Sequence, residues 1–64
     1  MAAVEINVAD HVAHVRLNRP DKHNAIDGEM MHGLLDGADR LAADPSVRVV
    51  VLSGNGPSFC SGLD

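Results

Sequence analysis

The sequence predicts an α/β fold in which a β-hairpin is followed by one helix and one further strand. Two short segments, residues 4–8 and 13–17, alternate apolar and polar side chains with the period of a strand. Residues 30–42 carry apolar side chains at helical spacing, and residues 47–52 form a continuous aliphatic run. A strand, a helix and a strand in succession predict a parallel pair joined by a crossover.

The two alternating segments predict a hairpin with one buried face. Val4, Ile6 and Val8 occupy every second position of the first segment, as do Ala13, Val15 and Leu17 of the second. Between the segments, Asp10 favours a turn, and the histidine after it tolerates positive φ better than most residues. We therefore expect a tight turn within residues 9–12.

The helix is expected to begin at Asp27 and to end near Ala43. Asp27 can cap the first turn, and Pro20 ends the preceding strand because it has no N–H to donate. A proline at position 45 disfavours helical backbone at the residue before it. Gly33 and Gly37 each weaken the helix by about 1 kcal/mol relative to alanine. They indicate either close packing against a neighbour or a weak helix.

Residues 47–52 predict a strand that is buried on both faces. Val47, Val49 and Val51 face one side, and Val50 and Leu52 face the other. A strand that is apolar on both sides belongs to a sheet covered on both sides. One helix covers only one face, so we expect residues 1–64 to be a fragment of a single larger domain.

Composition limits the class of protein. Sixty-four residues suffice for at most one small domain. The net charge of −4 argues against nucleic acid as a partner, and the one cysteine excludes an internal disulfide. The sequence has no N-terminal signal pattern and no apolar run of membrane-spanning length. We therefore expect a soluble cytoplasmic protein with no membrane partner.

A Gly-rich segment, residues 53–64, directly follows the aliphatic run, where α/β proteins place ligand chemistry. Its bare backbone N–H groups suit an anion or a developing oxyanion. A dinucleotide fingerprint and a nucleophile elbow both require glycine in place of Phe59, and no lysine follows residue 22 to complete a P-loop. Cys60 has no histidine after it, so we interpret it as a buried small hydrophobe. His11 and His14 are too weak a pair to indicate a metal site, and we expect none.

Positive charge gathers in one short stretch of this acidic chain. Arg16, Arg19 and Lys22 are three of the five Lys and Arg residues, and His23 follows them. Composition alone favours a solvated turn. The alternative is a local site for a phosphate-bearing ligand.

Two motifs stand in register along the chain. The first is Leu-Asn-Arg-Pro-Asp-Lys-His-Asn-Ala-Ile at residues 17–26, and the second is Val-Arg-Val-Val-Val-Leu-Ser-Gly-Asn-Gly-Pro-Ser-Phe-Cys-Ser-Gly-Leu-Asp at residues 47–64. With their spacing, they resemble the N-terminal part of the enoyl-CoA hydratase/isomerase (crotonase) family, whose members are several times longer. The resemblance implies the ClpP/crotonase spiral fold, of which this chain would hold the hairpin, the crossover helix and the buried strand.

The resemblance also implies roles for the Gly-rich segment. In that family, two backbone N–H groups stabilise the enolate of an acyl-CoA thioester. By motif match, Leu63 would supply the first of them, and Ser61, Gly62, Leu63 and Asp64 would line the acyl-CoA site. Asp64 would tether the loop rather than act as a general base. The second donor and the acidic residues belong to later motifs of the family, which these 64 residues do not include.

The first motif matches the family's loop for the nucleotide end of CoA. Ala25 would contact adenine through its backbone, with Lys22 and His23 near phosphate. CoA would then be part of the substrate, so we expect no separate cofactor. The partners implied are an acyl-CoA thioester and further copies of the chain, in a trimer or hexamer of the full-length protein.

The activity implied is hydration of 2-enoyl-CoA, of the kind used in fatty-acid oxidation. The 64 residues alone are expected to be inactive. Many hydratases have alanine where this chain has Leu63, so an isomerase or another crotonase activity stays open. A non-catalytic remnant that at most binds CoA or a partner subunit is the third alternative.

Overall fold

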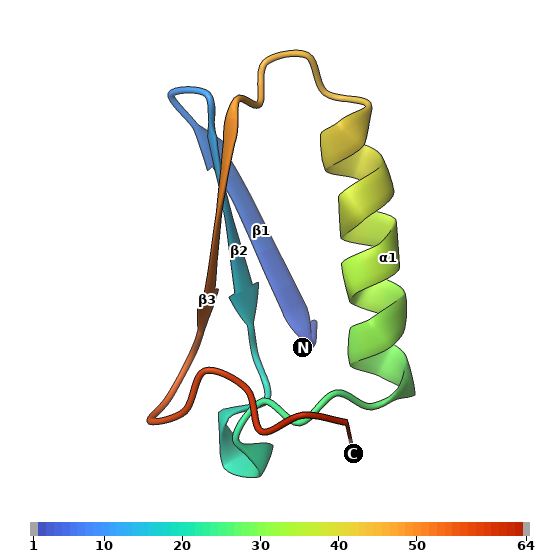
Figure 1. Cartoon of the computed structure of the whole chain (residues 1–64), viewed down its shortest axis with the longest axis vertical. Coiled ribbons are helices and arrows are strands. Elements are labelled where there is room, and N and C mark those ends of the chain that lie inside the picture. Colours follow the sequence, from blue (N-terminus) through green and yellow to red (C-terminus); the bar gives the residue numbers. More distant parts are fainter. Residues whose placement is uncertain (1, 64) are drawn as a thin grey trace.

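The computed structural model describes residues 2–63 and contains a hairpin, a helix and a further strand (Figure 1). Strands β1 (Val4–Ala9) and β2 (Val12–Leu17) precede the short 3₁₀ helix η1 (Pro20–Lys22), helix α1 (Gly28–Ala42) and strand β3 (Val49–Gly54). The sheet order is β1-β2-β3, with β2 antiparallel to β1 and parallel to β3. These elements confirm the predicted α/β fold and its parallel pair.

The hairpin turn consists of Asp10 and His11, which adopt positive φ angles of 51° and 67°. Ala9 pairs with Val12, so only two residues connect the strands. Positive φ at both central positions is the type I′ pattern, whose twist matches that of antiparallel strands. Along β2 every second residue is buried, which confirms the predicted alternation.

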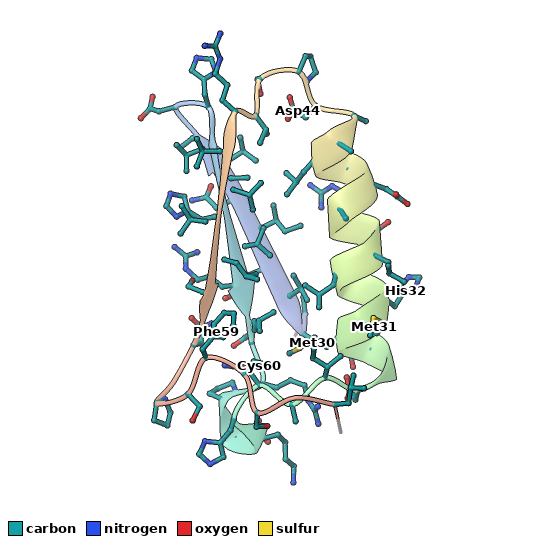
Figure 2. The ribbon with its side chains drawn as sticks, in the orientation of Figure 1. Met30, Met31, His32, Asp44, Phe59 and Cys60 are labelled. Atoms are coloured by element: carbon teal, nitrogen blue, oxygen red, sulfur yellow. The ribbon has the colours of Figure 1, made fainter. Side chains whose placement is uncertain are left out.

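Helix α1 is capped as predicted. The carboxylate Oδ1 of Asp27 accepts a hydrogen bond from the backbone N–H of Met30 at 2.9 Å. Met30 is fully buried on the sheet side of the helix, whereas Met31 and His32 point away from the sheet (Figure 2). The helix therefore presents one apolar side to the sheet and leaves the other in solvent.

The two helix glycines lie where α1 comes closest to β1. A Cβ atom at Gly33 would lie 3.1 Å from Cγ2 of Val4, and one at Gly37 would lie 2.7 Å from Cδ1 of Ile6. Both distances are shorter than ordinary van der Waals contact. Of the two explanations for these glycines, close packing is therefore the correct one.

The turn between α1 and β3 is fastened to the hairpin. The carboxylate of Asp44 accepts hydrogen bonds from the hydroxyl and the backbone N–H of Ser46, which lower the pKa of that carboxyl below its usual range. The Nδ1 atom of His11 lies 2.8 Å from the carbonyl oxygen of Ser46. The carbonyl of His11 accepts hydrogen bonds from the N–H groups of Arg48 and Val49. These contacts set where β3 begins.

Strand β3 differs from the prediction in its limits and in its burial. It spans Val49–Gly54 rather than residues 47–52, because it pairs with β2 over the whole length of that strand. Residues 49–52 are 42–53 % exposed, so one face is uncovered as expected, and the face toward the helix is also open. The reason is that α1 packs against β1, and nothing within residues 2–63 covers the other face of β3.

An open apolar groove of about 480 Å³ separates α1 from β3. Its walls include Leu34, Ala38 and Leu41 of the helix and Val50 and Leu52 of the strand. The two strand residues pair with buried residues of β2, which confirms the predicted assignment of faces. No helix formed by residues 2–63 combines the length and the hydropathy needed to cross a membrane.

Candidate functional site

Two loops meet at the edge of the sheet where the parallel strands β2 and β3 end (Figure 1). We call residues 18–27 the β2–α1 loop and residues 55–63 the C-terminal loop. The N-terminal end of α1 lies at the same edge. Open α/β sheets bind ligands at the carboxyl ends of their strands, so this edge is the candidate site.

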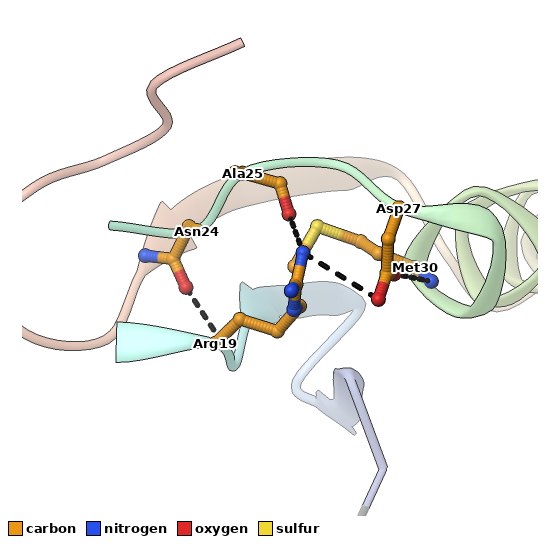
Figure 3. A network of polar contacts seen from close by, with 5 residues as sticks. All are labelled: Arg19, Asn24, Ala25, Asp27 and Met30. Atoms are coloured by element: carbon orange, nitrogen blue, oxygen red, sulfur yellow. Dashed lines mark hydrogen bonds and ion pairs between the residues drawn. The ribbon is translucent and has the colours of Figure 1, made fainter. Parts of the chain in front are cut away.

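The β2–α1 loop is held in shape by Arg19. Its guanidinium donates a hydrogen bond to the carbonyl of Ala25 and lies 3.5 Å from the carboxylate of Asp27 (Figure 3). The backbone carbonyl of Arg19 accepts hydrogen bonds from the N–H groups of Lys22 and Asn24. Arg19 is thus turned toward its own loop, and the positive cluster seen in the sequence does not act as one group.

Asn24 joins the two loops and is the fully buried polar residue of the described chain, with 0 % exposure. Its Oδ1 accepts a hydrogen bond from the N–H of Arg19 at 2.7 Å. Its Nδ2 donates to the carbonyl oxygens of Asn55 and Ser58, both at 2.9 Å. Its φ of 57° is the left-handed conformation that asparagine adopts more readily than most residues.

Sequence reasoning missed Asn24 because its partners lie 31 and 34 positions away. The available signal was an asparagine beside a histidine in a loop, since both residue types tolerate positive φ. His23 has a φ of 52° and forms a second link between the loops. Its Nδ1 lies 2.9 Å from the hydroxyl of Ser58.

Two glycines let the C-terminal loop lie directly on the β2–α1 loop. A Cβ atom at Gly54 would lie 2.5 Å from the carbonyl oxygen of Phe59 and 2.7 Å from Nδ2 of Asn24. Gly56 has a φ of 85°, and its Cβ would lie 2.7 Å from Cβ of Pro20. Side chains at these positions would therefore separate the loops.

A third link between the loops is a parallel β-bridge from Ile26 to Leu63. The N–H of Ile26 donates to the carbonyl of Gly62 at 2.8 Å. In a bridge of this register, the N–H and C=O of Ile26 face the partner segment, and those of Leu63 point away from it. The N–H of Leu63 donates to no residue that the structure describes, and Leu63 is 80 % exposed.

Cys60 sits beneath the exposed end of the C-terminal loop. It is half-buried and packs against the core cluster that includes Leu17 and Met30. Its sulfur accepts a weak hydrogen bond from the N–H of Gly62 at 3.4 Å. Cys60 therefore packs as a small apolar residue, and the positive φ of 103° at Gly62 turns the chain just before Leu63.

A family model covers most of the chain. Residues 7–64 match the model described as "Enoyl-CoA hydratase/isomerase". The chain belongs to the enoyl-CoA hydratase/isomerase family. Members of this family act on acyl-CoA thioesters.

Relatives within the family catalyse different reactions. The chain is 45 % identical over 62 residues to the (E)-benzylidenesuccinyl-CoA hydratase of Thauera aromatica, an alignment that covers 95 % of this chain and 24 % of that protein. It is 39 % identical over 61 residues to the 4-chlorobenzoyl coenzyme A dehalogenase-1 of an Arthrobacter species. That alignment covers 95 % of this chain and 22 % of the dehalogenase. The chain thus spans about a quarter of the length of the relatives it matches.

The fold agrees with that of solved family structures. PA4980 of Pseudomonas aeruginosa superposes with a TM-score of 0.96 at 39 % identity, over 100 % of this chain and 27 % of that one. The hairpin, helix and strand of this hydratase/isomerase family chain are therefore part of a crotonase fold, as the resemblance implied.

The structure brings together most of the residues that the resemblance singled out. Ala25 lies beside Gly62 and Leu63 through the bridge described above, and Ser61 is exposed on the same loop. The N–H of Ala25 donates a hydrogen bond to the carbonyl of Lys22. The carbonyl oxygen of Ala25 accepts one hydrogen bond from the guanidinium of Arg19 and has a second lone pair. The side chain of Lys22 is exposed and bonds to no described residue. Asp64 lies outside the described residues.

Proposed function

We propose that this chain supplies one oxyanion donor and the nucleotide-end contacts of an enzyme that hydrates 2-enoyl-CoA thioesters. In this reaction water gives up one proton to a base as its oxygen bonds to C3, and the electron pair of the C2=C3 bond moves toward the thioester carbonyl. The carbonyl oxygen takes up the negative charge of the enolate, and C2 then gains a proton as the carbonyl re-forms. Stabilising that oxygen lowers the barrier because its charge develops only on the way to the enolate.

The observation that carries the proposal is the N–H of Leu63, which donates to none of residues 2–63. A backbone donor that is already committed to a carbonyl cannot receive an oxyanion, whereas this one points away from its bridge partner. The bridge holds its position by the bond from Ile26 to Gly62. A donor that is fixed beforehand needs no reorganisation during the reaction.

The β2–α1 loop supports the CoA part of the proposal. The exposed ammonium of Lys22 and the exposed ring of His23 are available to phosphate, in a chain whose net charge is −4. The second lone pair of the Ala25 carbonyl can accept a hydrogen bond from the amino group of adenine. CoA is then part of the substrate, and no separate cofactor takes part.

Two alternatives remain. The family includes isomerases by description and a dehalogenase among the relatives, and Leu63 is larger than the alanine of many hydratases. A non-catalytic role would limit the chain to binding CoA or a partner subunit.

Assembly into a trimer or hexamer and a cytoplasmic location also remain predictions.

The proposal is tested in a segment-exchange enzyme, in which residues 1–64 replace the matching segment of the Thauera aromatica hydratase. The exchange enzyme is assayed with (E)-benzylidenesuccinyl-CoA and with crotonyl-CoA. Leu63→Pro deletes the N–H, whereas Leu63→Ala keeps it. The deleted N–H points away from the bridge partner, so the bond from Ile26 to Gly62 is kept in both variants. We expect Leu63→Pro to lower kcat by about 10²–10³-fold, the usual effect of losing one such donor. Leu63→Ala should keep most of the activity.

Circular dichroism and CoA affinity are measured alongside, because a misfolded variant would mimic the loss. A folded, CoA-binding Leu63→Pro enzyme with near-normal kcat would remove Leu63 from the mechanism. An exchange enzyme that binds CoA and turns over neither thioester would support the non-catalytic alternative.

A further inference from the structure

Asn24 donates two hydrogen bonds from the β2–α1 loop to the C-terminal loop. One carboxamide accepts from the β2–α1 loop through Oδ1 and donates to the C-terminal loop through both hydrogens of Nδ2. A primary amide accepts through its oxygen and donates two hydrogen bonds through its nitrogen, whereas a hydroxyl has one hydrogen to donate and a carboxylate has none. The side chain is completely buried, so solvent replaces none of these bonds if they are lost.

The two acceptors of Nδ2 lie at both ends of a short segment of the C-terminal loop. Asn55 continues the ladder of β3 through its N–H bond to the carbonyl of Leu17 at 2.9 Å. Ser58 is the second acceptor, and residues 59–61 then lead to Gly62. The course of the loop from the sheet to the proposed donor therefore depends on the carboxamide of Asn24.

We propose that Asn24 is a positioning residue, whose carboxamide aligns the N–H of Leu63 with the thioester by fixing the C-terminal loop to the β2–α1 loop. This inference rests on the proposed function, because alignment matters only if Leu63 is an oxyanion donor. The three hydrogen bonds of this carboxamide, which we call the Asn24 clasp, hold the β2–α1 loop and the C-terminal loop together. Asn24 itself touches neither the thioester nor the nucleotide.

Asn24→Asp distinguishes the bond that the side chain accepts within the β2–α1 loop from the two bonds that it donates to the C-terminal loop. The carboxylate keeps an acceptor for the N–H of Arg19, so the β2–α1 loop retains that bond. It loses both donors and sets a negative charge against the carbonyls of Asn55 and Ser58. Asn7→Asp is the matched control, since Asn7 is an exposed residue of β1.

In the exchange enzyme we expect Asn24→Asp to lower kcat by roughly 10–10²-fold, the effect of an ångström-scale misplacement of a reacting group. The dissociation constant for CoA should stay near that of the parent, because the β2–α1 loop keeps its internal bonds. Asn7→Asp should change neither value. The lost buried bonds should lower the melting temperature whatever the role of Asn24, whereas a merely structural role would also weaken CoA binding together with turnover.

Amide hydrogen exchange supplies a readout that does not depend on turnover. The N–H of Ile26 donates to Gly62, so its exchange should become faster when the C-terminal loop shifts. The N–H of Arg19 should stay protected in Asn24→Asp and serves as the internal control. Asn24→Gly, which keeps the left-handed backbone without strain, is the second variant if the aspartate variant does not fold.

Unchanged kcat in a folded Asn24→Asp enzyme would overturn the inference, as would unchanged exchange at Ile26. If the parent exchange enzyme itself has no turnover, the proposed function fails on its own. The rates at Ile26 and Arg19 then decide whether Asn24 positions the loop.

Discussion

Replacing Gly54 by alanine tests whether contact between the two loops is required for the site. Gly54 ends β3 without positive φ, so alanine meets no backbone strain there. Its Cβ would lie 2.5 Å from the carbonyl oxygen of Phe59, 2.7 Å from Nδ2 of Asn24 and 3.0 Å from Cα of Phe59. Two of these three atoms are backbone, and the third already makes two hydrogen bonds, so none can move without breaking the clasp.

The expected cost of Gly54→Ala is about 1–3 kcal/mol, the usual range for overpacking a tight site. In an enzyme of 150–250 residues, each kcal/mol shifts the melting temperature by roughly 2–4 °C, so we expect a fall of about 2–12 °C. Thermal unfolding of the segment-exchange enzyme measures it. Gly28→Ala is the control, because no atom lies within 4 Å of a Cβ at Gly28.

The same variant should lower kcat, because the C-terminal loop carries the proposed donor. A Gly54→Ala enzyme with the melting temperature and kcat of its parent would show that the loops can separate without consequence. That result would contradict the close approach on which both the oxyanion donor and the Asn24 clasp depend. A loss of the same size in Gly28→Ala would point to a general effect of adding a methyl group instead.

Three further predictions concern the nucleotide-end loop, the helix cap and the exposed strand. Lys22→Glu in the exchange enzyme should weaken the binding of acyl-CoA about tenfold at low salt and leave the binding of thioesters without the nucleotide unchanged, as measured by titration calorimetry. Equal losses of affinity for both kinds of thioester would count against a nucleotide-end role. Asp27→Ala should lower the free energy of unfolding by about 1 kcal/mol because the helix cap is lost. Asp27→Asn keeps the cap and loses only the ion pair with Arg19, which is worth less than about 1 kcal/mol. Equal melting temperatures for the two variants would contradict this prediction. The isolated 64-residue chain should self-associate and melt without cooperativity, because β3 is exposed on its face and at its edge; sedimentation of a monomer that melts cooperatively would contradict this.

Short-range chemistry made much of the fold predictable. The turn at Asp10 and His11 and the cap at Asp27 involve partners within a few residues, so their residue types suffice to predict them. The alternation along β2 predicted its buried face for the same reason, since strand geometry sets it locally. In β1, Val4 and Ile6 are half-buried and Val8 is exposed, so the prediction is correct there only in part. The two family motifs likewise include the two loops that meet at the candidate site.

The remaining features depended on partners that are distant in sequence. The limits of β3 follow from the length of β2, and its exposure follows from the path of α1 over β1. The cluster of positive charge separated because Arg19 bonds within its own loop, leaving Lys22 exposed.

The sequence by itself determined which segments become strands and where the helix starts. Only the tertiary structure decided that Asn24 is buried between the loops and that Gly54 must lack a side chain. The physical reason is that burial and close approach belong to pairs of segments. Residues 24 and 58 are 34 positions apart, and no local pattern records a contact over that separation.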